Sequence, residues 1–186
     1  MGLIAKICLL GDGKVGKTSL VNRYLGKGFT SDYLPTLGSE FASKEIQLKT
    51  VHGPKDIKFQ IWDLAGQPSF DQIRRVYYKG SIGAILVFDL TRFKSLKNLE
   101  HWVKEFNDNS DVPNHTLIVL ANKSDLKSQI KVTSKEIEDY IQTTLQDNNE
   151  TGFQSIKFLK TSAKTGENVE EAFEYLGYSI VKKLYG

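Results

Sequence analysis

The sequence predicts an α/β protein with a six-stranded, mostly parallel sheet between two layers of helices. Short, nearly continuous apolar runs occupy residues 4–10, 83–88 and 117–121, and such runs are typical of strands buried on both faces of a parallel sheet. A segment with helical spacing follows each run, so strand and helix alternate along the chain. This alternation favours a three-layer sandwich with about five helices. We expect one domain that spans residues 1–186.

The helices are recognised by their apolar faces, because residues three and four positions apart lie on one side of a helix. Two segments carry such a face, formed by Leu96, Leu99, Trp102, Val103 and Phe106 in one and by Val169, Ala172, Phe173, Leu176 and Ile180 in the other. We expect both faces to be buried against the sheet.

One pair of strands differs from the rest. Residues 40–48 and 57–62 have strand character, and the turn between them contains His52, Gly53 and Pro54. Because this turn is too short for a crossover helix, we expect an antiparallel hairpin, with one antiparallel strand at the edge of the sheet.

Alternation along this hairpin places aromatic side chains on its polar face. Ile57, Phe59 and Ile61 share one face, so Trp62 lies on the other. Phe41 has the parity of the polar residues in its strand. Two interpretations stay open: a helix or a loop covers both rings, or the rings form a patch that binds a partner, since exposed aromatic side chains favour interfaces.

The composition argues against several classes of protein. The formal net charge is only +3 and the basic residues are scattered, so nothing favours a nucleic-acid-binding protein. No apolar run approaches the roughly 20 residues of a membrane span. The single cysteine, Cys8, lies in an apolar strand, where we expect a small buried side chain. His52, His101 and His115 stand apart and predict no metal cluster. We expect a cytoplasmic monomer.

Residues 11–18 read GDGKVGKT and match G-x-x-x-x-G-K-[ST] directly after the first apolar run. The pattern is typical of a P-loop, in which glycines let the backbone turn successive N–H groups toward phosphates at the start of a helix. Lys17 is expected to reach the β- and γ-phosphates, and Thr18 to give its hydroxyl to Mg²⁺. The sequence therefore predicts a nucleoside triphosphate site.

A second phosphate element, DLAGQ, follows the second strand of the hairpin. Asp63 at the end of that strand can hold Mg²⁺ through water, and the Gly66 N–H can meet a γ-phosphate oxygen. The side-chain amide of Gln67 both donates and accepts, which is what orienting an attacking water requires. These residues predict hydrolysis as well as binding.

The identity of the base is predicted by two later loops. NKSD at residues 122–125 and TSAK at residues 161–164 each end a predicted strand, on the ligand-bearing edge of the sheet. The Asp125 carboxylate can accept from N1–H and the exocyclic amine of guanine, a pair of donors that adenine lacks. The Ala163 backbone N–H can donate to the guanine carbonyl. The predicted nucleotide is GTP.

In this combination the motifs resemble those of the Ras superfamily of small GTPases, and within it the Rab family most closely. The resemblance spans the chain from Lys6 to about Leu184, through GDGKVGKTSL, YLPTLGSEF, WDLAGQ, YYKGSIGAILVFDLT, NKSD and TSAKTGENVEEAF. It implies the P-loop NTPase sandwich and a GTP-hydrolysing molecular switch, a Rab-like regulator of membrane trafficking or signalling.

The resemblance also implies the roles of individual residues. Thr36 is the switch I threonine that touches Mg²⁺ and the γ-phosphate, Phe29 packs on the guanine, and Gly13 stands where a side chain would obstruct hydrolysis. The implied catalytic residues are Gln67, Lys17, Thr36 and Gly66, and the implied metal-binding residues are Thr18, Thr36 and Asp63. The expected nucleotide site comprises Gly13, Lys14, Val15, Gly16, Lys17, Thr18, Ser19, Phe29, Thr36, Gly66, Asn122, Lys123, Asp125, Ser162, Ala163 and Lys164.

Partner proteins are expected at two switch loops, residues 32–40 and 66–78, and at Phe41, Trp62 and Tyr77, which fall where Rab proteins carry an aromatic triad read by effectors. Exchange factors and activating proteins are expected at the same loops. The sequence places no arginine near Thr36, so we expect slow intrinsic turnover, which a partner's arginine would raise by about 10³- to 10⁵-fold.

Two features depart from the family pattern. Pro68 follows Gln67, where Rab, Rho and Ras proteins usually carry glutamate, and a proline disfavours the α region in the residue before it. Either Gln67 is conformationally biased and hydrolysis is slow, or the loop tolerates the proline. The chain also ends KKLYG without the cysteine that Rab tails prenylate. Either a lipid-bearing tail lies beyond this sequence, or the protein has no lipid anchor.

Two alternatives to a GTP-hydrolysing switch stay open. If Pro68 disables Gln67, the chain is a nucleotide-gated binding module with negligible hydrolysis. A P-loop kinase or ATPase is the other alternative, and Asp125 argues against it.

Overall fold

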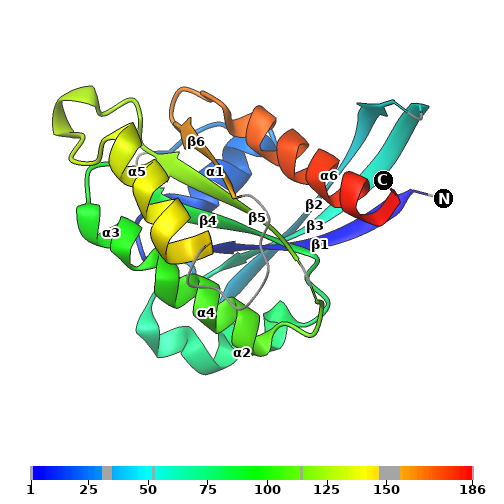
Figure 1. The fold of residues 1–186 in the computed structure, drawn as a ribbon, viewed down its shortest axis with the longest axis horizontal. Helices are drawn as coiled ribbons and strands as arrows, with labels where there is room; N and C mark the ends of the chain where they lie inside the picture. The colour runs from blue at the N-terminus through cyan, green and yellow to red at the C-terminus, as the bar shows by residue number, and fades with distance from the viewer. Residues whose placement is uncertain (1, 31–34, 52, 114, 147–155, 186) are drawn as a thin grey trace.

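A computed structural model describes residues 2–30, 35–51, 53–113, 115–146 and 156–185 (Figure 1). At its centre is a six-stranded sheet in the order β2-β3-β1-β4-β5-β6. The strands are β1 (Leu3–Leu10), β2 (Ser39–Thr50), β3 (Gly53–Leu64), β4 (Gly83–Asp89), β5 (Thr116–Asn122) and β6 (Lys157–Thr161). The edge strand β2 runs antiparallel to β3, and the other neighbouring pairs are parallel. The predicted sheet is confirmed.

Helices cover both faces of this sheet, as Figure 1 shows. On one face lie α1 (Lys17–Tyr24) and α6 (Val169–Tyr185), and on the other α2 (Asp71–Tyr78), α3 (Phe93–Lys97), α4 (Leu99–Asn109) and α5 (Ser134–Tyr140). The described residues form six α-helices, in keeping with the prediction of about five, and Asn98 interrupts what the apolar spacing predicts as one helix. Shorter 3₁₀ turns at Pro68–Phe70 and Lys127–Gln129 and a π-helix at Ile141–Gln146 complete the described helical structure.

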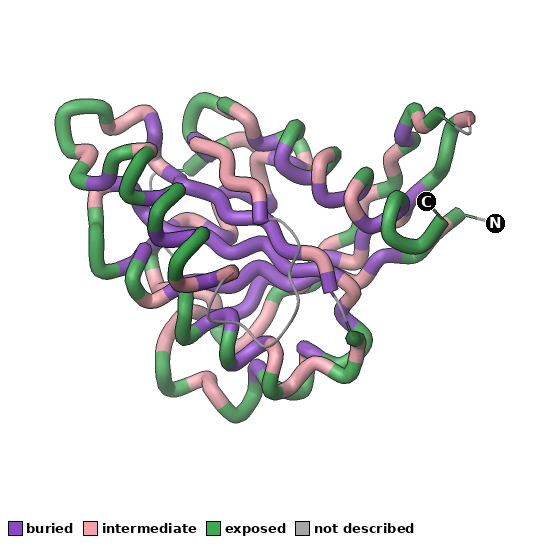
Figure 2. Tube along the Cα trace, viewed as in Figure 1, coloured by how far each residue is buried: buried purple, intermediate pink, exposed green. Residues whose placement is uncertain are grey.

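The alternation of side chains along the central strands divides the core into two layers. Ile7 and Leu9 of β1 pack toward α1 and α6, whereas Cys8 and Leu10 pack toward α3 and α4. The central strands are buried along most of their length (Figure 2). This explains why their sequences read as continuous apolar runs instead of alternating ones.

The hairpin is longer than its sequence predicts. Gly53 and Pro54 lie in β3 and not in the turn, while His52 lies outside the described residues. The pairing of β3 with β1 begins only at Ile57. Pro54 therefore lies where β3 has a neighbour on one side, and a missing N–H is tolerated at such a position.

Cys8 is the small buried side chain that the sequence predicts. It has no exposed surface, burial raises the pKa of its thiol to about 11, and its Sγ lies 3.2 Å from the Ser81 Oγ. Of the helices that the structure describes, none is both long and apolar enough to cross a membrane.

Candidate functional site

Loops that follow five of the six strands meet at one edge of the sheet. They come after β1, β3, β4, β5 and β6. In open α/β sheets, ligands bind outside the carboxyl ends of parallel strands. The motifs predicted to contact nucleotide therefore lie on loops that the topology brings together.

The loop of residues 11–16 forms a cradle at the start of α1. Gly11 and Gly16 have φ angles of 142° and 102°. A β-carbon on Gly11 would collide with a carbonyl oxygen of β4, and one on Gly16 would collide with the side-chain amide of Asn122. Lys14 also has a positive φ, 68°, although it is not a glycine. Such conformations turn successive N–H groups to one side, which makes a concavity for an anion.

Lys17 is almost fully buried within this cradle. Its Nζ donates to the carbonyl oxygens of Gly11 and Asp12 at 2.6 and 3.1 Å. Burial lowers the pKa of Lys17 to about 8, and the carboxylates of Asp63 and Asp12 oppose this shift. A buried ammonium group beside a row of N–H groups is suited to binding a highly charged anion.

Three side chains whose oxygen atoms can bind a metal ion come together beside Lys17. The Thr18 hydroxyl donates to Asp63 Oδ2 and lies 2.9 Å from the Thr36 Oγ1. Asp63 Oδ1 is buried and has no hydrogen-bond partner among the described residues. Burial raises the pKa of Asp63 to about 6, while the charge of Lys17 lowers it. Hydroxyl and carboxylate oxygens are the ligands that Mg²⁺ prefers, so the three residues fit the group that the sequence predicts there.

The loop after β3 packs directly on the cradle. A β-carbon on Gly66 would lie 2.5 Å from backbone atoms of the cradle. Gln67 has φ −87° and ψ 144° and precedes Pro68, the first residue of a 3₁₀ turn. This extended conformation is the one that a following proline favours. The Gln67 Cγ nevertheless lies 4.0 Å from where a β-carbon of Gly13 would be, so the side chain rests against the cradle.

The first switch loop is described only in part, because residues 31–34 lie outside the described ranges. The Gly38 carbonyl accepts from the Ala65 N–H at 2.9 Å. Thr36 contacts Thr18, as above. The first switch loop is therefore hydrogen-bonded to the residue that precedes the second switch loop and to the first turn of α1.

The loops after β5 and β6 form a second group of polar residues. Asp125 Oδ1 accepts from the Ser162 hydroxyl at 2.7 Å. Asn122 donates through Nδ2 to the Val15 carbonyl at 2.8 Å, and its Oδ1 accepts from the Ala163 N–H at 3.3 Å. Asn122 thus joins the cradle to both of these loops. The contacts of Asp125 and Ala163 with a base stay predictions.

Three further predicted residues lie around these groups. Lys123 has φ 70°, and its Nζ lies 2.6 Å from Asp89 Oδ2. Ser19 is half-buried in the first turn of α1. Phe29 has an exposed ring. Their contacts with nucleotide also stay predictions.

Two side chains that hold the loops of the site in place, Arg23 and Trp102, were not predicted from the sequence patterns. Arg23 of α1 donates from Nε to the Ala163 carbonyl at 2.8 Å and also binds the Lys164 carbonyl. The Asp12 carboxylate accepts from the Trp102 Nε1 at 2.9 Å. Helical spacing places Trp102 in the core, and a buried indole N–H needs an acceptor. This requirement could have predicted a polar partner for Trp102 from the sequence.

Phe41, Trp62 and Tyr77 form one aromatic cluster beside the switch loops. The ring centroids of Phe41 and Trp62 lie 5.1 Å apart, and those of Trp62 and Tyr77 lie 4.8 Å apart. Trp62 and Tyr77 are half-buried, whereas Phe41 is 57% exposed. The interpretation that a helix or a loop covers both rings therefore fails for Phe41.

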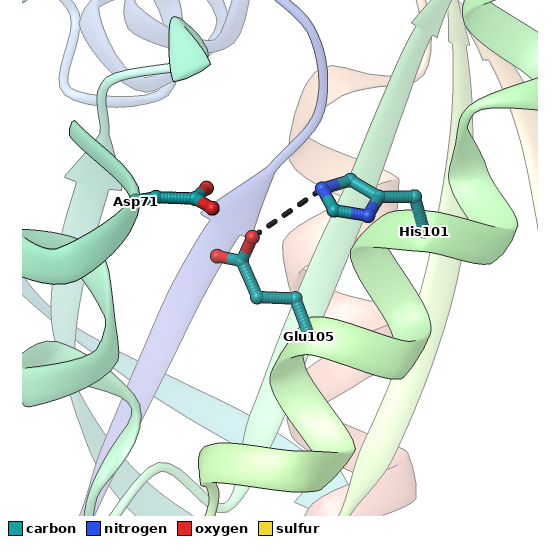
Figure 3. A group of neighbouring side chains, drawn as sticks. All are labelled: Asp71, His101 and Glu105. Carbon is teal, nitrogen blue, oxygen red and sulfur yellow. Dashed lines mark ion pairs between the residues drawn. The ribbon is translucent and has the colours of Figure 1, made fainter. Parts of the chain in front are cut away.

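Another polar cluster lies between α2 and α4, where Asp71, His101 and Glu105 point toward one another (Figure 3). His101 Nε2 lies 3.4 Å from Glu105 Oε2, so the prediction that His101 stands apart is wrong. Arg74 donates to both carboxylates, at 2.9 Å in the case of Glu105 Oε1. The guanidinium neutralises the acidic groups, which argues against a cation site there.

Comparison with known proteins gives a consistent result. The profile of the Ras family matches residues 6–182. The Ras-related protein RIC2 of Oryza sativa subsp. japonica is 39% identical over 181 residues, which are 96% of this chain and 76% of the relative. The Ras-related protein Rab-13 of Rattus norvegicus is 36% identical over 97% of this chain and 82% of the relative. The Ras-related protein RABA1h of Arabidopsis thaliana is 38% identical over 90% of this chain and 70% of the relative.

Members of this family bind guanine nucleotide, generally with Mg²⁺, and act through effectors, exchange factors and activating proteins. The match covers the cradle, both switch loops and the two loops expected at the base. The chain therefore belongs to the Ras family, as a Rab-like small GTPase that hydrolyses GTP and works as a molecular switch.

Proposed function

We propose that residues 1–186 work as one switch domain whose phosphate site comprises Lys17, Thr18, Thr36 and Asp63. The observation that carries the proposal is the meeting of these residues at one point. They come from the first turn of α1, the first switch loop and the end of β3. A ligand bound there would therefore hold separate parts of the chain together.

The chain's own residues supply most of the proposed mechanism. Water attacks the γ-phosphate of GTP in line, which gives GDP and phosphate. Lys17 and the N–H groups of residues 13–18 stabilise charge on the phosphates. Gln67 orients the water, and the Gly66 N–H holds the γ-phosphate. When bound, Mg²⁺ supplies positive charge that neutralises the developing negative charge.

The switch follows from the same contacts. Thr36 and Gly66 belong to different loops, and both reach the γ-phosphate in the proposed complex. Loss of that phosphate removes both contacts and releases both loops. Partners that bind the loops then distinguish the GTP form from the GDP form.

Asp125 is proposed to select guanine. The Ser162 hydroxyl donates to one of its carboxylate oxygens, and this bond orients the group without neutralising it. A carboxylate has lone pairs for several donors. It can therefore also accept from the two donors on the edge of guanine.

Partners are proposed to bind the aromatic cluster of Phe41, Trp62 and Tyr77 together with the neighbouring switch loops. Leu37 and Val76, in these loops, are 80% and 68% exposed. Exposed apolar and aromatic side chains in one region are typical of protein interfaces. This supports a regulator of membrane trafficking or signalling that acts through this surface, and we propose that it does so as a monomer.

The test is to identify the nucleotide that copurifies with the chain and to follow its conversion with Mg²⁺ present. We expect GTP to be converted to GDP, and ATP to compete for the site at least 100-fold more weakly than GTP, because a site built to hydrogen-bond one base edge rejects an edge that lacks the donors. Asp125→Asn should lose most of this preference. Asp108→Asn, which removes an exposed carboxylate of α4, is the charge-matched control. Equal displacement by ATP and GTP would contradict the proposal and favour a kinase or an ATPase.

The conformation of Gln67 is proposed to slow hydrolysis. We expect Pro68→Glu to hydrolyse bound GTP a few-fold faster than the native chain in a single turnover, since Gln67 regains access to the α region. Equal rates would show that the loop tolerates proline. Phosphate release that stays at background in both proteins, even with activating proteins, would favour the nucleotide-gated binding module.

A further inference from the structure

The phosphate cradle has a neighbour that none of the predicted motifs contains. Arg92 lies in the turn between β4 and α3, and its Nη2 donates to the Gly13 carbonyl at 2.9 Å. Gly13 lies in the cradle next to Gln67. The Arg92 side chain is 42% exposed, so burial does not explain why it adopts this position.

Asp89 holds a second nitrogen of the Arg92 guanidinium. Its Oδ2 lies 3.2 Å from the Arg92 Nε and 2.6 Å from the Lys123 Nζ. Burial favours a raised pKa for Asp89, but hydrogen bonds from Lys123 and Thr91 outweigh it and lower the pKa. Asp89 is therefore a charged, buried anchor. A planar guanidinium whose Nε and Nη2 donate to two different acceptors has little freedom to turn.

The carbonyl that Arg92 binds belongs to the peptide bond between Gly13 and Lys14. A trans peptide is planar, so its C=O and its N–H point in opposite directions. When Arg92 holds the Gly13 oxygen, the Lys14 N–H is directed to the other side of the loop. Lys14 itself has φ 68°, a region that a residue with a β-carbon avoids unless its surroundings hold it there.

The charge of Arg92 also reaches the phosphate site. Its guanidinium is bound to the Gly13 carbonyl of the cradle. A positive charge fixed at this position favours a negative charge in the cradle. An anion in the cradle is therefore stabilised by Arg92 without touching it.

We infer that Arg92 is a positioning residue for GTP hydrolysis, which holds the Gly13–Lys14 peptide so that the Lys14 N–H donates to the triphosphate. The inference rests on the proposed function and deepens it. Arg92 also adds a fixed positive charge at the rim of the site. It supplies from within the chain part of the electrostatic stabilisation that is otherwise expected from a partner.

The test compares Arg92→Ala with Lys94→Ala, which removes the same charge from an exposed position two residues away on α3. Each protein is loaded with GTP and Mg²⁺, and hydrolysis of the bound nucleotide is followed in a single turnover. GTP dissociation is measured separately, and the Lys14 amide resonance is recorded in the GDP complex. We expect Arg92→Ala to slow hydrolysis roughly tenfold, the effect of one hydrogen bond to a charged group. We expect its Lys14 resonance to move upfield and Lys94→Ala to change neither.

Arg92→Lys separates positioning from folding. It keeps the positive charge and a donor nitrogen, but it lacks the second nitrogen with which Arg92 binds Asp89 and Gly13 at once. It should recover part of the rate and part of the shift of the Lys14 resonance. A native rate and an unmoved resonance in both Arg92 variants would overturn the inference alone, whatever their thermal stability. A native chain that binds no GTP would overturn the proposed function, and the inference with it.

Discussion

At the scale of the residue, the site depends on places where backbone approaches backbone. Gly66 lies so close to the cradle that an added β-carbon would meet main-chain atoms at 2.5 Å. Gly13 differs, because among the described residues an added β-carbon there would meet only the Gln67 side chain, at 4.0 Å. Main-chain atoms cannot move aside as the end of a side chain can. The two glycines are therefore expected to serve stability and hydrolysis differently.

Gly66→Ala should lower the free energy of unfolding by about 1–3 kcal/mol, the usual cost of forcing extra atoms into a packed site. Gly13→Ala should change it by less than about 0.5 kcal/mol, because its methyl group makes only ordinary contacts. Urea unfolding of both variants measures the difference. Gly13→Ala should still slow GTP hydrolysis, since its methyl group stands between the cradle and Gln67. Equal stability of the two variants would contradict the packing argument.

His115 is a buried titratable residue away from the nucleotide loops. Its Nε2 lies 2.6 Å from Asn107 Oδ1. Burial lowers its pKa below the ordinary value of 6.5, and the charge of Lys183 contributes in the same direction. The folded chain therefore binds the proton less readily than the unfolded chain. The lowered pKa therefore stabilises the folded chain when His115 is neutral. This stabilisation is complete above pH 6.5 and declines as the pH falls toward the folded-state pKa.

We expect the free energy of unfolding to fall between pH 7.5 and pH 5.5 on account of His115, because the unfolded chain binds the proton more readily than the folded chain does. His115→Gln should show a shallower dependence over this range. Urea unfolding at several pH values in both proteins is the measurement. Parallel pH profiles would show that His115 does not contribute.

At the scale of the element, α2 is fastened to α4 by an ion pair. Arg74 of α2 is 1% exposed, and its Nε and Nη2 donate to the Glu105 carboxylate at 2.9 and 3.0 Å. The Tyr78 hydroxyl donates to Glu105 at 2.5 Å. Arg74 Nη1 also donates to the carbonyl oxygens of Ala65 and Gln67, at 3.1 and 2.8 Å. One buried guanidinium therefore links the second switch loop to a helix that lies outside both switches.

Glu105→Leu should lower the free energy of unfolding by up to about 3–5 kcal/mol, because it removes the buried carboxylate of the pair and leaves Arg74 with only the more exposed carboxylate of Asp71. The double variant Arg74→Met with Glu105→Leu should recover much of that loss, since both charges are then absent. A double-mutant cycle by urea unfolding gives the coupling between the two residues. Additive effects of the single changes would contradict the role of this pair.

At the scale of the whole molecule, the nucleotide site joins segments that are distant in the sequence. The cradle, the two switch loops and the loops after β5 and β6 all contribute to one edge of the sheet. Hydrogen bonds within the protein itself already join some of these segments, such as that of Asn122 with Val15 and that of Gly38 with Ala65. A ligand that binds all of these loops binds only the folded chain. It should therefore stabilise the entire fold.

Removal of Mg²⁺ with a chelator, followed by removal of nucleotide, should lower the unfolding temperature in two steps. A ligand present at 1,000 times its dissociation constant stabilises the folded state by about 4 kcal/mol. Thermal unfolding before and after each removal measures this effect, and Mg²⁺ with excess GDP should restore it. An unfolding temperature that is independent of both would mean that the site does not bind them.

The sheet and the motif positions could be predicted from the sequence because they depend on local patterns. An apolar run such as residues 83–88 indicates a strand that is buried on both faces of the sheet. A glycine-rich loop before a helix indicates a phosphate cradle. Pro68 likewise predicted that Gln67 avoids the α region, and Gln67 is extended in the structure. These signals need no knowledge of distant residues. They determined the fold class, the family and the loops at which nucleotide is expected.

Only the tertiary structure decided which distant side chains support those loops. Arg92 reaches Gly13 across 79 positions of sequence, and Arg74 reaches Glu105 across 31. His101 and Glu105 are four positions apart on α4 and are neighbours within that helix, but Asp71 joins them only once α2 packs on α4. No local pattern encodes the contacts between elements, because each depends on how two elements pack. The sequence by itself determined what the site binds, and the packing determined what holds the site in shape.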